Sequence, residues 1–499
     1  MVKRLTLILV AALIVGLAVP AFAEVQNIKV SGDILLRGVA RDRFDLNNGG
    51  GGENILDDSM AHVLSTVRLR VDADLTDNVS ATVRLINERV WGQSWYDNQG
   101  SGAGATGAET IAGDNLVELD LGYITLKEFL YSPLTLVLGR QPLRYGMGFI
   151  VGDPDTNQFS EYNHYGNTAA TVTQVDTIVP EDLSSLKAFD AARAILDYNP
   201  LVIDIIYAKI NEGVVLGTTA VGENDDVNLY GVNAGYNWGT DKNIQQEVYV
   251  FAKEIGKDGG VGGQTTYGVA GNDYDRTVTV GTRASIEPME RLFIAGEVAW
   301  QSGKKYVPAQ AGITTYSYLA DRDAFAAQAI AQLALDMKYS PVLGIEFTHY
   351  SGDNYPNGIA APELQEIKDY EAWDPMFEDQ AGGRIYNALF SSTNCNILTA
   401  SVSLMPIEDV TLKIEFSNLI LDEEFNVYTT SWTPSDYATY TVVPGEDDLG
   451  KEVDVTLTYD YTEDVQFGLT AGLFIPGEVF SYVNNATAMQ TVGSVKVTF

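Results

Sequence analysis

The feature that most constrains this chain is a pair of long segments with alternating chemistry, residues 59–75 and 79–90, joined by Thr76-Asp77-Asn78. Small or aliphatic residues occupy every second position, and polar or charged residues such as Arg68, Arg70 and Arg84 lie between them. A period of two is typical of β-strands with one apolar and one polar face. A soluble sandwich would turn the charged face to bulk water. A membrane barrel would turn it into a lumen, with the aliphatic face toward lipid.

The N-terminus indicates export. Lys3 and Arg4 precede the apolar run 5–19, which is followed by Pro20-Ala21-Phe22-Ala23. This order of a charged region, a short apolar region and an A-x-A site predicts a signal peptide at residues 1–23. Residues 24–499 would then form one barrel domain. No later stretch reaches the ~18 apolar residues that a membrane-spanning helix needs, so a membrane form of this chain must be a barrel.

The last residues alternate in the same way and end at Phe499. Val495, Val497 and Phe499 lie on one face of residues 489–499, and Lys496 and Thr498 lie on the other. This pattern resembles the signal that outer-membrane proteins present to the barrel assembly machinery, which is therefore an expected partner. Outer-membrane lipid and lipopolysaccharide are the other expected partners.

The unit of two amphipathic strands, a tight turn and a longer polar segment recurs along the chain. We predict an all-β transmembrane antiparallel barrel of about eighteen strands, with sixteen and twenty as alternatives. A soluble sandwich does not explain why long segments follow every second strand only. The predicted strands are 28–41 and 489–499 at the two ends, with hairpins 59–75/79–90, 116–126/134–145, 186–198/201–210, 227–238/244–254, 276–286/292–301, 326–339/342–350, 396–404/410–420 and 452–461/465–474 between them. Short turns would be periplasmic and long loops extracellular. Aromatic residues near the strand ends are predicted to form two interfacial girdles, with Tyr131, Tyr198 and Tyr339 at the turns and Trp300 and Tyr350 toward the loops.

The composition limits the classes of function. The chain has 67 acidic and 31 basic residues, a net charge of −36, which argues against nucleic-acid binding because such binding needs a basic surface. Cys395 is the only cysteine, so no disulfide framework is possible. His62, His164 and His349 show no metal-ligand spacing, and no G-x-S-x-G motif occurs. We therefore expect neither an enzyme nor a cofactor.

Acidic stretches in the loops leave two alternatives open. Asp225-Asp226 and Glu446-Asp447-Asp448 could hold Ca²⁺ between loops, or they could simply be solvated.

Strand parity places many charged side chains on the polar face. Basic residues concentrate in the first three strands, and acidic residues weigh more heavily in the second half. Rings of charge set the selectivity of a pore, whereas adjacent opposite charges neutralise each other across strands; both interpretations stay open. The inward-pointing candidates include Arg37, Arg41, Arg68, Arg70, Arg84, Glu88, Arg193, Arg283, Asp33, Asp72, Asp204, Glu297, Asp336, Lys338, Glu346, Lys413, Glu415 and Asp454.

Residues 138–153 carry Gly139-Arg140-Gln141 followed by Arg144-Tyr145-Gly146. They resemble the strand end of the alginate-export family of outer-membrane barrels, and residues 119–124 resemble the strand that pairs with it there. The resemblance implies an eighteen-strand barrel that passes a polyanionic polysaccharide or other solutes, with Arg140, Gln141 and Arg144 in contact with the pore. Parity, however, places Arg140 on the lipid face unless a bulge intervenes.

These observations predict an outer-membrane channel for passive passage of hydrophilic solutes, with the loop 146–185 folded inward to narrow the lumen. The mixed inward charges favour a broad porin over an alginate conduit, so anionic and saccharide solutes both stay open. A structural or adhesive barrel with acidic, Ca²⁺- or partner-binding loops is the alternative, and an integral outer-membrane enzyme is a third.

Overall fold

The computed structural model describes the strands, the turns and part of each longer loop. The described residues are 27–48, 59–91, 117–154, 181–211, 227–239, 241–255, 275–307, 318–353, 369–379, 384–427, 429, 431–432, 434 and 439–499.

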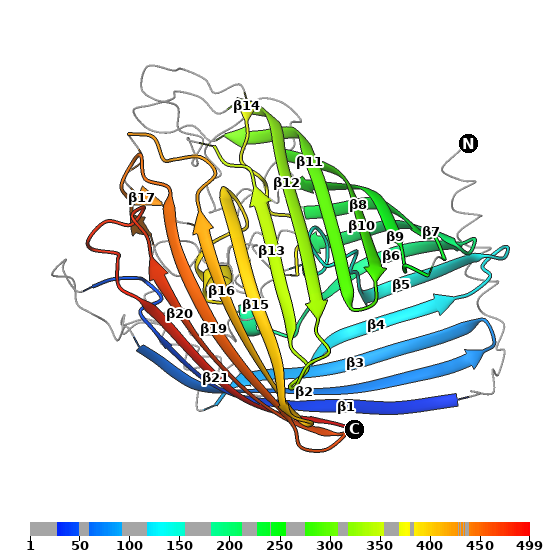
Figure 1. The fold of residues 1–499 in the computed structure, drawn as a ribbon. Coiled ribbons are helices and arrows are strands. Elements are labelled where there is room, and N and C mark those ends of the chain that lie inside the picture. Colours follow the sequence, from blue (N-terminus) through cyan, green and yellow to red (C-terminus); the bar gives the residue numbers. More distant parts are fainter. Residues whose placement is uncertain are drawn as a thin grey trace, which may run out of the picture.

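Eighteen long strands form one closed antiparallel barrel (Figure 1). Each strand pairs with its neighbour in the chain, and the last strand pairs with the first. The predicted fold and strand number are confirmed. The strands are β1 (Asn27–Asp42), β2 (Ser59–Thr76), β3 (Val79–Val90), β4 (Glu118–Leu126), β5 (Leu134–Pro142), β6 (Ala188–Asp197), β7 (Leu201–Asn211), β8 (Val227–Asn237), β9 (Gln245–Ile255), β10 (Asp275–Met289), β11 (Leu292–Val307), β12 (Tyr318–Ala334), β13 (Val342–Tyr350), β15 (Cys395–Ile407), β16 (Val410–Ile420), β19 (Asp448–Asp460), β20 (Val465–Pro476) and β21 (Ala488–Thr498).

The seam between β21 and β1 closes the barrel. At its end the Gly32 N–H donates to the Phe499 carbonyl at 2.8 Å, and the Phe499 N–H donates to the Gly32 carbonyl at 2.9 Å. The Phe499 ring lies over Gly32, where a Cβ would come within 2.7 Å of the ring. From Gly32 to Asp42, closure pairs the edge of β1 with β21, as a sheet inside a membrane requires.

The two faces of the wall follow the sequence alternation. In β2 and β3 the aliphatic side chains of Val67, Leu69 and Val83 are exposed on the outside, while Arg68 and Arg84 point inward and are largely covered. Tyr131, Tyr198 and Tyr339 are exposed at the turn side, as predicted for a girdle. Trp300 is exposed at the loop side.

One aromatic residue departs from the predicted girdle. Tyr350 is only 3% exposed, because it faces the lumen and stacks on Phe149 with ring centroids 5.5 Å apart. The girdle prediction for Tyr350 is wrong.

The largest error in the predicted strands concerns residues 326–339. The observed strand β12 begins eight residues earlier and ends at Ala334, and the chain then turns until Pro341. Within this turn the Leu335 N–H donates to the Pro341 carbonyl at 2.8 Å. Asp336, which pairs with Arg291 at 3.1 Å, and Lys338 therefore lie in the turn and do not line the lumen as predicted.

Short elements lie in the described parts of the loops. They are the 3-10 helix η2 (Glu181–Leu183), the two-residue strand β14 (Asp369–Tyr370), the helix α2 (Ile385–Leu389) and the small hairpin β17 (Ser431–Trp432) with β18 (Tyr440–Thr441). β14 runs parallel to β12 and extends the wall at its loop end. No helix among the described residues is long and apolar enough to cross a membrane.

Candidate functional site

Segments of several loops fold back against the inner wall on the loop side. The two that meet most closely are residues 143–154, which follow β5, and residues 369–379, which lie between β13 and β15. We call them the first and second inserted segments. They restrict the loop-side half of the lumen, which makes the surrounding surface the candidate functional site.

Backbone hydrogen bonds join the two inserted segments. Val151 and Phe377 form a parallel β-bridge, in which the Phe377 N–H donates to the Ile150 carbonyl at 2.9 Å and the Gly152 N–H donates to the Phe377 carbonyl at 2.6 Å. The Asp379 N–H donates to the Gly148 carbonyl at 2.8 Å. The two segments therefore form one unit.

An apolar layer holds this unit on the wall. Phe377 is fully buried, and its ring packs edge-on against Phe189 of β6 with centroids 6.0 Å apart. Burying an aromatic side chain of this size stabilises the docked state by about 2–3 kcal/mol. The layer also contains Leu143, Tyr145, Phe149, Ile150, Val151, Trp373 and Met376 from the segments, and Ile206, Leu229, Tyr249, Phe251, Ala299, Ala324 and Ala326 from β7 to β12.

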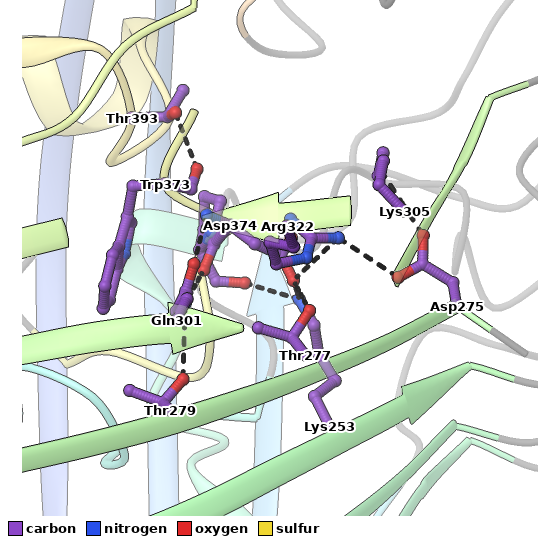
Figure 2. Close-up of polar contacts among 11 residues, drawn as sticks. Lys253, Asp275, Thr277, Thr279, Gln301, Lys305, Arg322, Trp373, Asp374 and Thr393 are labelled. Atoms are coloured by element: carbon purple, nitrogen blue, oxygen red, sulfur yellow. Dashed lines mark hydrogen bonds and ion pairs between the residues drawn. The ribbon is translucent and has the colours of Figure 1, made fainter. Parts of the chain in front are cut away.

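Asp374 is the polar anchor of the second inserted segment (Figure 2). Its carboxylate lies 2.8 Å from the Lys253 ammonium and accepts a hydrogen bond from the Thr277 hydroxyl at 2.6 Å. Its backbone exchanges two hydrogen bonds of 2.8 Å with the Gln301 amide. Burial alone would raise the pKa of Asp374, but Lys253, Arg322 and Lys305 hold that pKa well below its usual range. Asp374 is therefore ionised while the segment is docked.

Helix α2 is a further inserted element, which lies on the arc of the wall that includes β19, β20 and β21. Helix α2 lies against β20 and β21, and the N–H groups of Ile385 and Tyr386 donate to the two Glu452 carboxylate oxygens at 2.6 and 2.8 Å. Arg384 donates to Glu415 at 2.9 Å. An apolar cluster around Phe390 completes this contact.

Residues 181–187 lie on a third arc, formed by β1 to β3. Arg41 pairs with Asp182, and Arg37 donates to the Leu183 carbonyl and, at 3.1 Å, to the Thr66 hydroxyl. Glu88 accepts hydrogen bonds from the Ser184 hydroxyl at 2.8 Å and from the Ser185 N–H at 2.9 Å. We predicted that Arg37, Arg41 and Glu88 line the pore. In the structure they hold residues 181–187 against the wall.

We predicted that the loop 146–185 folds into the lumen. Its beginning and its end both do so. Its middle, residues 155–180, lies outside the described residues.

A cluster of charges lies where the two inserted segments meet residues 181–187. Asp379 pairs with both Arg144 and Lys187, and Lys187 lies 3.3 Å from Asp153. Burial lowers the pKa of Lys187, but Asp153 and Asp379 outweigh it and raise that pKa. The side chains of Arg144 and Lys187 stay 47% and 38% exposed, so they face an open part of the lumen.

The other inward arginines all have carboxylate partners. Arg68 forms a bidentate pair with Asp33, Arg70 one with Asp72, and Arg84 pairs with Asp120. Arg193 pairs with Asp204, and Arg283 lies 3.1 Å from Glu247. Of the two interpretations left open by the sequence, the structure shows the neutralised one.

The prediction that Arg140 lines the pore is wrong. β5 pairs with β4 and β6 without a register shift at this position, so Arg140 lies on the same outward face as the exposed Leu138. There it pairs with Asp190 of β6 at 3.2 Å. No bulge restores the inward position that the pore contact would require.

Gln141 points inward but binds the wall itself. Its amide nitrogen donates to the carbonyls of Val137, Gly139 and Ala191 at 3.0–3.1 Å. Gly139 has φ +120°, and a Cβ there would lie 2.2 Å from the Gly122 carbonyl oxygen. The Gly-Arg-Gln motif therefore shapes the end of β5 just before the chain enters the lumen.

A substitution tests this role of the motif. We expect Gly139→Val to destabilise the barrel by at least about 1–3 kcal/mol, because a β-branched residue must adopt a forbidden φ and displace β4. Gly38→Ala, where no atom lies within 4 Å of the new Cβ, is the matched control. The folded fraction after heating to a series of temperatures is measured by gel electrophoresis, in which folded and unfolded barrels migrate differently. Equal unfolding temperatures for the two variants would contradict this account.

The anchoring roles of Asp374, Lys253 and Glu452 could not be predicted from the sequence. The one available signal was the apolar run Trp373 to Phe377, interrupted by Asp374-Pro375, in an otherwise polar loop. Among the described residues no three His, Cys, Asp or Glu side chains are placed to hold a metal ion. His164, Asp225 and Asp226 lie outside the described residues.

Solved structures of other proteins show the same fold. The channel OccK2 (OpdF) of Pseudomonas aeruginosa is 8% identical, aligns over 95% of this chain and 99% of its own, and gives a TM-score of 0.51. Its complex with glucuronate gives the same identity and coverage with a TM-score of 0.50. At this identity the likeness shows the fold alone. A comparison with curated proteins gives no match.

A family model described as alginate export matches residues 223–494. The resemblance to that family predicted from the sequence is confirmed, although the residues that suggested it, 116–153, lie outside the matched region. The matched part is more than half of the chain and runs from just before β8 to near the end of β21. The chain belongs to the alginate export family and is an outer-membrane β-barrel.

Proposed function

We propose that the protein is a passive channel for small hydrophilic solutes, with a lumen narrowed by the inserted segments. One observation carries the proposal. Charged side chains that face inward between the middle of the wall and its turn side remain accessible to water: Arg70 is 36% exposed, Asp72 33% and Lys413 44%. Because a third or more of each of these ion-paired side chains is open to solvent, we infer that this part of the lumen is wet.

The surroundings of these charges suit a diffusion path. The inner wall toward the turn side carries Ser401, Ser403, Thr456, Thr470 and Ser494, which are all half-buried and polar. The wet region narrows toward Arg144 and Lys187 at the inserted segments. A path lined by hydroxyl and charged groups lets polar solutes exchange their hydration water for wall contacts.

We further propose that the protein carries out transport rather than catalysis and needs no cofactor. Family membership supports transport. The two described histidines, His62 on β2 and His349 on β13, lie on different strands and on opposite faces of the wall. Ca²⁺ bound between acidic loops stays a prediction; in the stretch Glu446–Asp448 the Asp448 carboxylate already pairs with Lys451 at 3.3 Å.

Recognition of the last strand by the assembly machinery, and contact of the barrel with lipopolysaccharide, also stay proposals. β21 supports the first, because it alternates in chemistry along its length and pairs with β1 at the seam.

The experiment that tests the channel is conductance across a planar lipid bilayer. Purified, folded protein should give stepwise ion currents, because the lumen is wet and the wall is closed against lipid. The same preparation after heat unfolding is the control and should give none. Folded protein that inserts into the bilayer and carries no current would contradict the proposal.

A further inference from the structure

Three Arg–Asp pairs cluster on the inner face of β1 to β4, at the middle of the wall. Arg68 donates to both carboxylate oxygens of Asp33 at 2.9–3.1 Å. Arg70 donates to both oxygens of Asp72 at 2.7 and 2.8 Å. Arg84 pairs with Asp120, which β4 supplies at a register shift opposite Arg84 and Leu85. We call these six residues the paired arc.

The strand register explains why each arginine has its own carboxylate. Arg70 and Arg84 lie directly opposite each other in the β2–β3 ladder, where like charges repel. Asp33 lies directly opposite Arg68 in the β1–β2 ladder. Each guanidinium is thereby drawn along the wall to a carboxylate, and the arc of three cations and three anions has no net charge.

Pairing leaves hydrogen-bonding capacity on the lumen side. A guanidinium has five N–H donors, and Arg68 uses only Nε and Nη2 on Asp33. The side chains of Asp72 and Arg70 are one-third exposed, so acceptors and donors lie next to each other on the wet wall. A sugar hydroxyl, which both donates and accepts, can bind such a surface. An anion is attracted by the arginine and repelled by the neighbouring carboxylate.

Ion pairs between basic and acidic side chains continue around the rest of the inner wall. Arg193, Arg283 and Arg384 pair with Asp204, Glu247 and Glu415. Lys413 shares Glu415 at 2.9 Å. Carboxylates beside these cations weaken the positive field that would concentrate a polyanion.

We propose that the paired arc selects uncharged polyhydroxylated solutes, and that Asp33 and Asp72 determine this specificity by cancelling the charge of Arg68 and Arg70. The inference rests on the proposed channel function. It assigns to this chain a neutral saccharide class of solute rather than an anionic one.

The test combines reversal potentials in a KCl gradient with liposome swelling in glucose and in gluconate, which are similar in size and differ in charge. The wild-type channel should show no strong preference for chloride and should pass glucose faster than gluconate. The double variant Asp33→Asn/Asp72→Asn exposes two guanidinium charges, so the chloride preference and the gluconate rate should each rise several-fold. Arg68→Ala/Arg70→Ala should shift selectivity toward potassium.

Asp190→Asn is the matched control, because it breaks an Arg–Asp pair on the outward face and should leave selectivity unchanged. A wild-type channel that already prefers chloride several-fold would overturn the inference, and this measurement needs no variant to fold. A double asparagine variant that folds and keeps the wild-type selectivity would also overturn it. Absence of any current would instead overturn the channel function itself.

Discussion

Replacing Asp374 by alanine should release the second inserted segment from the wall and enlarge the conducting path. The carboxylate faces Lys253 at 2.8 Å and Arg322 at 3.8 Å in a largely buried setting. Without it, Lys253 keeps only the Pro375 carbonyl, at 2.6 Å, and the Thr277 hydroxyl loses its acceptor. The docked segment would then cover the Lys253 ammonium without its anion, whereas Arg322 would keep Asp275 at 3.1 Å.

Removing one partner of a buried ion pair costs about 3–5 kcal/mol. A loss of about 3 kcal/mol shifts the equilibrium between docked and released segment about a hundredfold. The apolar layer around Phe377 still favours docking, so we expect a channel that fluctuates between the wild-type conductance and a larger one. Because the first inserted segment is bridged to Phe377, both segments should move together.

Single-channel recordings measure the change. Asp321→Asn is the control. Asp321 precedes Arg322 on β12 and pairs with Lys304 of β11, but the side chains of Asp321 and Lys304 are 65% and 48% exposed. Such an exposed pair contributes about 0–1 kcal/mol, so the control should behave as wild type. A folded Asp374→Ala channel with the conductance and noise of the control would show that the apolar layer alone fixes the segment.

The wall could be predicted from the sequence because its pattern is local. Period-two alternation identifies the lipid-facing side of a strand, and it correctly predicted that Arg68, Arg70 and Arg84 point inward. Parity also gave the warning that Arg140 would face outward, and the structure bears that warning out. Where the alternation is weak, as in the alanine-rich β12, the predicted strand was displaced by several residues.

The contents of the lumen could not be predicted in the same way. Asp374 reaches Lys253, Thr277 and Arg322 on three different strands, and no period in the sequence connects these positions. Strand parity places Glu452 on the inner face, but its two partners are backbone N–H groups of a five-residue helix in a loop. Contacts of this kind depend on register and loop path, which only the assembled barrel defines.

The second inserted segment should also respond to pH through Glu378. This side chain is 2% exposed, and burial raises its pKa to about 7 from the ordinary value of 4.5. Ser392 and Lys253 oppose that rise, and Asp374 reinforces it. Tyr350 is packed near the same carboxyl.

The direction of the pH dependence follows from whether the docked or the released state binds the proton. A released segment exposes Glu378 and returns its pKa to the ordinary value, so between the two pKa values the docked state holds the proton and the released state does not. Docking is therefore strongest below the released-state pKa and weakens as pH rises through about 7. The full difference corresponds to about 3 kcal/mol.

We accordingly expect more frequent openings to the larger conductance at about pH 8 than at about pH 5. Glu378→Gln keeps the uncharged form at every pH and should abolish the dependence while leaving the segment docked. Asp369→Asn, at the exposed beginning of the same segment, is the control and should keep the wild-type profile. An unchanged pH profile in Glu378→Gln, or a wild-type channel that opens as pH falls, would assign the response to other groups. If the expected profile is found, the acidity of the medium sets the width of the path that the inserted segments leave open.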